Sequence, residues 1–140
     1  MKISTKGRYA LQLLTDLAEH SEDGYVPLSD VSERTGISKN YLEQIIFHLK
    51  DTDWLEAARG ASGGYRLAKP PIAYTVADIM RVTEGSVKPD DCPDDGEVCE
   101  HSGGGKCQSL KVWRGLDNVI TDYLTSISLQ DVLSDSIECK

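Results

Sequence analysis

The chain has 140 residues, 39% of them hydrophobic, and a formal net charge of −8 at pH 7. No run of about 18 or more apolar residues is present and the N-terminal segment lacks an apolar signal region, so we expect a cytoplasmic protein without a membrane span. Because the cytoplasm keeps thiols reduced, the four cysteines are expected to be free thiols or metal ligands rather than disulfides.

The acidity is unevenly distributed along the chain. Residues 1–69 hold 9 Lys and Arg against 10 Asp and Glu, whereas residues 70–140 hold 6 against 13. An acidic total disfavours general attraction to nucleic acid, but local potential rather than net charge steers binding. We therefore expect any nucleic-acid surface to lie in the first half of the chain.

The first half predicts three helices. Apolar residues at helical spacing predict the first over residues 4–20. A short helix is expected over residues 28–36, with Ser29 as its N-cap and the terminal glycine as its stop. A third helix is expected over residues 38–50, with Ser38 as its cap. Its apolar face consists of Leu42, Ile45, Ile46 and Leu49.

A small hairpin is expected after the third helix. Leu55–Ala58 and Tyr65–Ala68 can pair as strands across the glycine-rich turn at residues 59–64. The order of two helices joined by a turn and followed by a hairpin with a basic tip is typical of a winged helix-turn-helix. In that motif the second helix enters a major groove and the hairpin tip can reach a minor groove. These residues also leave open an ordinary small α+β domain with a glycine-rich surface loop.

The polar side of the 38–50 helix carries short side chains that can reach base edges or phosphates. Phosphate repels the carboxylate of Glu43, so its presence there suggests discrimination between bases. Arg59 at the hairpin tip can enter a minor groove. The expected DNA-contacting residues are Lys2, Ser38, Lys39, Asn40, Tyr41, Glu43, Gln44, Arg59, Gly60 and Ser62.

The second half predicts three further helices. Residues 75–78 form a capping-box pattern that opens a short helix ending at Glu84. A long helix over residues 109–126 has a heptad seam that favours a partner helix, with packing on its own domain as the alternative. Residues 128–131 repeat the capping-box pattern before a last short helix. The seam consists of Trp113, Leu116, Ile120, Tyr123 and Ile127.

Three cysteines lie in a stretch without hydrophobic periodicity. Residues 86–108 contain Cys92, Cys99 and Cys107 among polar neighbours, whereas structural cysteines are usually surrounded by apolar side chains. A loop of this length in a compact domain indicates function or disorder. The spacing lacks the Cys-x-x-Cys pair common in zinc sites, and it leaves an iron–sulfur cluster, zinc and redox-active thiols open.

Several segments, taken in order, resemble one known family. MKISTKGRYAL, ISKNYLEQ and RGASGGYRL, followed by the three cysteines, are similar to the Rrf-type winged-helix transcriptional regulators, and most similar to their IscR type. The resemblance extends from Met1 to about Leu133. It implies a mainly α fold with a small β-hairpin wing, a homodimer formed through the long C-terminal helix, a double-stranded DNA operator as partner, and a [2Fe-2S] cluster on the three cysteines.

The fourth cluster ligand is not assigned by this resemblance. The IscR pattern has a histidine three residues after the third cysteine, where this chain has Leu110. The NsrR pattern uses an acidic residue at the position occupied here by Arg8. The remaining candidates are His101, Cys139, a loop carboxylate such as Glu100, or solvent.

Three segments follow from these inferences. They are a winged helix-turn-helix domain over residues 1–85, a cluster-binding loop over 86–108, and a dimerisation helix with a C-terminal tail over 109–140. We expect no enzymatic activity, because nucleophile-elbow, P-loop and dinucleotide motifs are absent. By resemblance, the predicted function is a transcriptional regulator that senses iron–sulfur cluster status and controls cluster-biogenesis genes. The alternative is a family member that responds to cysteine metabolism or thiol redox state without a stable cluster.

Overall fold

The fold is mainly α-helical with one two-stranded antiparallel hairpin, as the sequence predicted. This computed structural model describes residues 3–20, 22, 24–88 and 107–139. No helix in these ranges is long and apolar enough to cross a membrane. In chain order the elements are α1 (Thr5–Glu19), α2 (Leu28–Thr35), α3 (Lys39–Leu49), β1 (Leu55–Ala58), β2 (Gly64–Leu67), a 3₁₀ turn (Pro71–Ala73), α4 (Val76–Glu84), α5 (Leu110–Thr125) and α6 (Leu129–Leu133).

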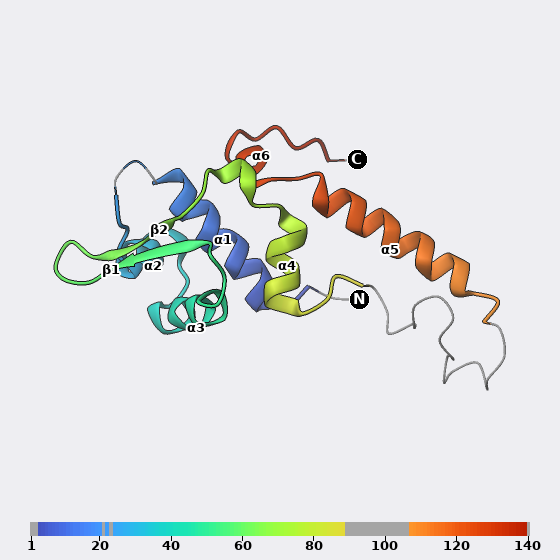
Figure 1. The fold of residues 1–140 in the computed structure, drawn as a ribbon, viewed down its shortest axis with the longest axis horizontal. Helices are drawn as coiled ribbons and strands as arrows, with labels where there is room; N and C mark the ends of the chain where they lie inside the picture. Colours follow the sequence, from blue (N-terminus) through green and yellow to red (C-terminus); the bar gives the residue numbers. More distant parts are fainter. Residues whose placement is uncertain (1–2, 21, 23, 89–106, 140) are drawn as a thin grey trace.

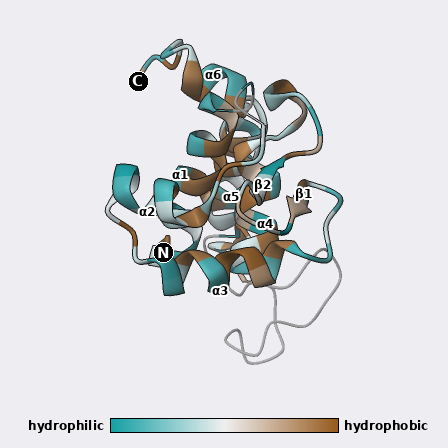
Figure 2. Cartoon of the chain, turned by 90° about the vertical axis from the view of Figure 1, so that its left-hand side faces the viewer, coloured by the Kyte–Doolittle hydropathy of each residue, from teal (hydrophilic) through white to brown (hydrophobic). Residues whose placement is uncertain are grey.

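Helix α1 forms the centre of the body. It contacts α2, α3, α4, α6 and β2, which surround it (Figure 1). The side chains of Leu13, Leu14 and Leu17 are completely buried, and each contributes about 1.5–3 kcal/mol relative to an exposed side chain. Coloured by hydropathy, the helices turn their apolar sides inward and their polar sides outward (Figure 2). The core therefore fixes the positions of α2 and α3.

Helices α2 and α3 form the expected helix-turn-helix. Gly36 ends α2 in the left-handed conformation with φ 75°, and Ser38 caps α3. The predicted cap of α2 was wrong, because α2 begins at Leu28 with Pro27 as its N-cap and Ser29 lies inside the first turn. Leu28 is buried, so its packing draws the start of the helix ahead of the serine.

The wing is the hairpin of β1 and β2. Its first strand has the predicted bounds, whereas the second begins one residue earlier than predicted, so that Ala58 pairs with Gly64. A residue upstream of α2 joins the hairpin: the N–H of Val26 donates to the carbonyl of Tyr65 at 2.8 Å, and the Tyr65 N–H donates back at 2.9 Å. These bonds tie the wing to the helix-turn-helix.

Tyr74 connects the base of the wing to the body. Its side chain is 1% exposed. Its hydroxyl donates to the carbonyl of Trp54 at 2.7 Å and accepts from the N–H of Lys69 at 3.1 Å. Its ring meets the Trp54 ring edge-on at 5.6 Å. Burial raises the pKa of Tyr74, so the hydroxyl stays protonated and can donate at neutral pH.

Side-chain caps open α4 and α6. The hydroxyl of Thr75 accepts from the N–H of Asp78 at 3.1 Å and donates to the Asp78 carboxylate at 2.8 Å. Ser128 and Asp131 form the complete capping box that the sequence predicted. The bond from the N–H of Ser128 lowers the pKa of Asp131, so the cap persists at neutral pH.

The two capped segments also pair with each other. The N–H of Val76 donates to the carbonyl of Ile127, and the N–H of Leu129 donates to the carbonyl of Tyr74, each at 2.9 Å. This pairing anchors the C-terminal end of α5 beside the start of α4. The C-terminal part of α5 contacts α4 through Ile120 and Leu124, and the rest of α5 projects beyond the body (Figure 1).

Tyr74→Phe should lower the free energy of unfolding by about 1–3 kcal/mol, because it removes both hydrogen bonds of the hydroxyl, to the Trp54 carbonyl and from the Lys69 N–H. Urea denaturation at one protein concentration measures this change. Tyr25→Phe is the matched control, since it keeps the ring under the Arg66 guanidinium and its change should stay within about 0.5 kcal/mol. Equal stabilities of the two variants would contradict the anchoring role of Tyr74.

Candidate functional site

Helix α3 has a buried side and a fully accessible side. Leu42, Ile45 and Leu49 are completely buried and Ile46 nearly so, as the sequence predicted. The opposite side is polar apart from one aromatic residue. Its exposed residues are Ser38, Lys39, Asn40, Glu43, Gln44, Phe47, His48 and Lys50.

Two of the predicted DNA-contacting residues also hold α3 in place. The hydroxyl of Ser38 accepts from the N–H of Tyr41 at 3.2 Å, which caps the helix. The half-buried Tyr41 ring lies edge-on to Tyr9 of α1, with centroids 5.3 Å apart. Tyr41 therefore joins α3 to the central helix, whereas Lys39, Asn40, Glu43 and Gln44 stand free of the core.

The wing tip is exposed to solvent and forms a tight turn. Arg59, Gly60 and Ser62 are all exposed. Gly60 has a φ of 102°, and its carbonyl accepts from the N–H of Gly63 at 3.0 Å. At Gly64 a Cβ would overlap the carbonyl of Val26, so only glycine permits this approach of β2. Lys2, the remaining predicted contact, lies outside the described residues.

Other basic residues near the wing form ion pairs. Nε of Arg66 donates to Glu56 Oε2 at 2.6 Å across the hairpin, and its guanidinium lies over the Tyr25 ring at 4.5 Å. The bond from Glu56 raises the pKa of Arg66. Lys69 pairs with Asp53 at 2.8 Å. The charges of Glu56 and Arg66 within the two strands thus neutralise each other, and Arg59 lies outside this pair at the wing tip.

An ion pair between the exposed Arg34 and the buried Asp16 connects α2 to α1, and sequence reasoning missed it. Asp16 is 7% exposed. Arg34 donates to it twice, from Nε to Oδ1 and from Nη2 to Oδ2, each at 2.9 Å. These bonds raise the pKa of Arg34. The two residues are 18 positions apart, so no local pattern relates them.

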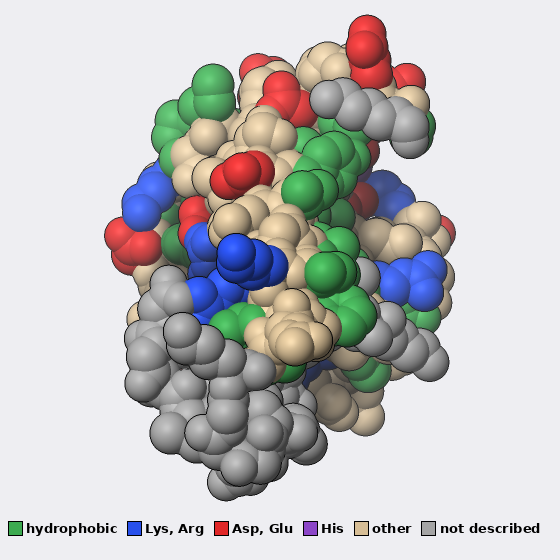
Figure 3. Space-filling view, turned by 90° about the vertical axis from the view of Figure 1, so that its right-hand side faces the viewer, with side chains coloured by type: hydrophobic (Ala, Val, Ile, Leu, Met, Phe, Trp, Pro, Cys, Tyr) green, Lys and Arg blue, Asp and Glu red, His purple; other side chains and the backbone are tan. Residues whose placement is uncertain are grey.

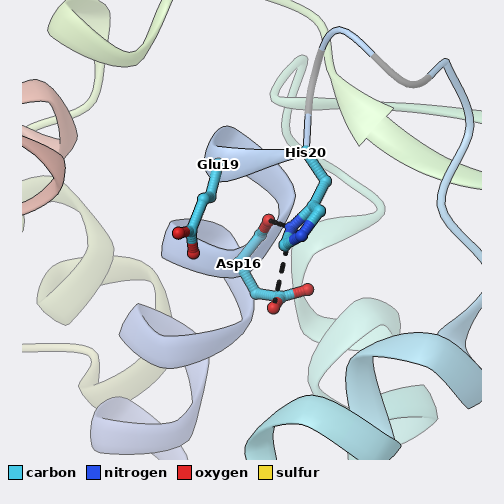
Figure 4. Close-up of side chains that lie close together, drawn as sticks. All are labelled: Asp16, Glu19 and His20. Atoms are coloured by element: carbon cyan, nitrogen blue, oxygen red, sulfur yellow. Dashed lines mark hydrogen bonds and ion pairs between the residues drawn. The ribbon is translucent and has the colours of Figure 1, made fainter.

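Asp16 also belongs to a group that could be mistaken for a metal site. Asp16, Glu19 and His20 lie at the end of α1 with ligand atoms within 4.8 Å of one another (Figure 4). Both carboxylate oxygens of Asp16 already bind the Arg34 guanidinium, and Nδ1 of His20 lies 2.9 Å from the Asp16 carbonyl. A fixed positive charge disfavours a cation, so this group is an ion-pair cluster that secures α2.

One predicted thiol ligand lies within the described residues. Cys107 is half-buried just before α5, with its Sγ 3.2 Å from the hydroxyl of Ser109. Hydrogen bonds from Ser109 lower the pKa of the Cys107 thiol, which favours the thiolate that binds metals. Cys92, Cys99 and the candidate ligand His101 lie outside the described residues, and Cys139 is exposed near the C-terminus.

Helix α5 has a large apolar surface in contact with solvent. Seen from the end where α5 projects, hydrophobic side chains lie on the surface beside basic ones (Figure 3). On its other side, Ile120 and Leu124 line a recess of about 110 Å³ with Met80 of α4. The exposed apolar residues are Val112 (62%), Trp113 (40%), Leu116 (38%), Val119 (66%) and Tyr123 (45%).

Comparisons with known proteins agree with this arrangement. The model of the Rrf2 family, described as an iron-dependent transcriptional regulator, matches residues 3–135. The HTH-type transcriptional regulator IscR of Vibrio vulnificus strain YJ016 is 38% identical over 136 residues, 97% of this chain and 79% of the relative.

Two solved structures are similar over almost the whole chain. The structure of T. potens IscR has a TM-score of 0.77 at 39% identity, covering 98% of this chain and 89% of that one. CymR, the global cysteine regulator of B. subtilis, has a TM-score of 0.79 at 33% identity, covering 96% and 98%. These similarities confirm the predicted winged-helix fold.

Gly64→Ala should destabilise the fold by about 1–3 kcal/mol, because β2 must move away from Val26 to accommodate the methyl group. Thermal or urea unfolding measures the change. Gly60→Ala is the control, since Gly60 also has a positive φ but nothing lies within 4 Å of an added Cβ. The prediction is wrong if Gly60→Ala costs as much as Gly64→Ala.

Proposed function

The chain belongs to the Rrf2 family of iron-dependent transcriptional regulators, and from this premise we propose a homodimeric operator-binding protein that senses iron–sulfur cluster status through Cys92, Cys99 and Cys107. Members of this family are DNA-binding regulators, so the chain is not an enzyme. The observation that carries the sensing proposal is the Cys107 thiol, stabilised as a thiolate at the start of the helix with the exposed apolar surface.

The proposed DNA surface combines the outer side of α3 with the wing tip. The N-terminal part of a recognition helix contacts base edges in a major groove, and Lys39, Asn40, Glu43 and Gln44 are the exposed residues there. Arg59 then reaches the adjacent minor groove or its phosphates. The bonds between Val26 and Tyr65 support this division, because they hold the wing at a fixed position relative to α2 and α3.

The proposed dimer interface is the exposed side of α5. Its apolar residues have a heptad spacing, and an exposed apolar surface of this kind marks a protein contact. A symmetric pair of α5 helices would bury it and place two copies of α3 for successive half-sites, about 34 Å apart. We also propose the division into a DNA-binding domain over residues 1–85, a cluster-binding loop over 86–108 and a dimerisation helix with its tail over 109–140. A cytoplasmic location is part of the same proposal.

The donor set fits a [2Fe-2S] cluster. Thiolates are the protein ligands of iron–sulfur clusters, and the lowered pKa of Cys107 favours its thiolate form. When bound, the cluster would supply a centre whose presence and oxidation state report the iron–sulfur supply. His101 is the proposed fourth ligand. Cluster-biogenesis genes are the proposed targets, because the similar relatives carry the name IscR.

The second candidate function is a regulator of cysteine metabolism or thiol redox state. The similarity to CymR favours it, since that structure matches this chain over almost its whole length. Under this alternative the same thiols would be oxidised and reduced without holding iron. Iron and sulfide analysis therefore separates the two functions.

Arg59→Ala should weaken operator binding and reduce the slope of log K against log salt concentration by about 0.9, the effect of one lost phosphate contact. Fluorescence anisotropy over a salt series measures the slope. Arg66→Ala is the matched control in the same hairpin, because Arg66 is held by Glu56 and its removal should leave the slope unchanged. Equal slopes for Arg59→Ala and wild type would exclude the wing-tip contact.

Anaerobically purified protein should contain iron and sulfide and absorb visible light. Cys92→Ala, Cys99→Ala and Cys107→Ala should each abolish this absorption and change DNA selectivity while leaving a folded dimer. Cys139→Ala, the control, should retain both properties. His101→Ala should shift the spectrum or make the cluster labile.

Two results would count against the sensing proposal. One is zinc without iron in the anaerobic protein. The other is a triple cysteine variant that keeps its DNA preference and its response to iron starvation. A diamide-sensitive affinity for DNA in an iron-free protein would support the thiol-redox alternative instead.

A further inference from the structure

Phe47 is an anomaly on the polar side of α3. Its side chain is 61% exposed although the other exposed residues of this helix are polar. Solvent exposure of a large aromatic side chain brings no benefit to folding, because burial is what makes such a side chain stabilising. A contact made outside the monomer would bury this phenyl group, and the position of Phe47 on α3 indicates what that contact is.

Helical spacing places Phe47 in line with the proposed base-contacting residues. Asn40, Glu43 and Phe47 follow one another at intervals of three and four residues, so they lie along one side of α3. At 1.5 Å of rise per residue, Asn40 and Phe47 are about 10 Å apart along the helix, or about three base-pair steps. A helix lying in a major groove would thus bring Phe47 to the same groove as Glu43.

The surroundings of the ring favour nucleic acid over protein as its partner. The ammonium of Lys50 lies over the ring, 3.8 Å from its centroid. A cation on one face of the ring holds its orientation and puts positive charge beside it, as a site between phosphates requires. The His48 ring meets the Phe47 ring edge-on with centroids 6.2 Å apart, and 61% of Phe47 is still exposed for a further apolar contact.

We propose that Phe47 is a specificity-determining residue that contacts the 5-methyl group of a thymine in each half-site. Among the groups displayed in a major groove, the thymine methyl is the apolar one, and a phenyl ring is a suitable partner for it. Phe47 then recognises thymine by apolar contact while Glu43 and Gln44 use hydrogen bonds. This inference rests on the proposed placement of α3 in the major groove.

The experiment replaces single thymines by deoxyuridine, which removes only the methyl group. An operator is first selected from random DNA with wild-type protein, and each thymine is then replaced in turn while affinity is measured at fixed salt. At one thymine per half-site, wild-type protein should lose about fourfold in affinity, the effect of one buried methylene-sized group. Phe47→Ala removes the contact in both half-sites of the dimer, so it should lose about sixteenfold on unmodified operator, twice the free energy of one methyl contact, and no more on deoxyuridine DNA.

Two further variants sharpen the result. Phe47→Leu should keep part of the preference for thymine, because it keeps an apolar side chain. Ile72→Ala is the control, since Ile72 is 70% exposed outside α3 and should behave as wild type. Circular dichroism and size-exclusion chromatography establish that each variant is folded and has the same oligomeric state as wild type.

The outcomes that overturn the inference differ from those that overturn the proposed function. Two results overturn the role of Phe47 alone. One is a wild-type affinity that does not change when any thymine is replaced by deoxyuridine. The other is a Phe47→Ala variant that still distinguishes thymine from deoxyuridine at the same position. A folded but monomeric Phe47→Ala assigns the ring to a subunit contact and also overturns it. A selection that returns no motif overturns operator binding itself, together with this inference.

Discussion

The burial of α1 is the constraint on which the rest of the structure depends. Leu13, Leu14 and Leu17 are inaccessible to solvent because α2, α3, α4, α6 and β2 all pack against α1. Close-packed interiors resist displacement, so an element on one side of α1 has a fixed position relative to an element on the other. The outer side of α3 and the wing tip can therefore form one rigid surface, although each is itself a short segment.

The distribution of charge limits the positive potential around the proposed DNA surface. The chain is acidic overall, and within the described residues Arg34, Arg66, Lys69 and Arg81 form ion pairs inside the fold. Those pairs reduce the positive potential available to phosphates. Phosphate contacts supply most of the non-specific affinity for DNA. With few unpaired cations, contacts to bases therefore contribute a larger share of the binding free energy. The carboxylate of Glu43 on α3 also lowers non-specific affinity, because phosphate repels it.

Local features of the sequence predicted local structure well. The cap at Ser38, the apolar spacing of α3 and the box at residues 128–131 each lie within one or two helical turns, and the structure contains all of them. Predictions were wrong where a distant contact decides the outcome. Ser29 is a good capping residue, but buried Leu28 starts α2 earlier. β2 begins at Gly64 because Val26 approaches there.

Side-chain bonds between distant positions could not have been predicted from one sequence. Tyr74 reaches a carbonyl 20 positions away, and Arg34 reaches Asp16 over 18. In both pairs the polar groups meet only because the core has already assembled around them. Trp113, Leu116 and Tyr123 of the predicted α5 seam are exposed, whereas Ile120 lines the recess beside α4 and Ile127 packs against the core. Cys92 and Cys99 lie outside the described residues, so their placement stays a prediction.

The attachment of α5 gives it the mechanics of a lever. The backbone hydrogen bonds of Val76 and Leu129 fix its C-terminal end beside the start of α4. This fixed end is the pivot of the lever. The 16 residues of α5 make an arm of about 24 Å, with Cys107 at the far end. A tilt of about 5° would thus move that end by about 2 Å. Tyr74 lies at this attachment and also holds the base of the wing, so the helix that follows Cys107 and the wing share one anchoring point.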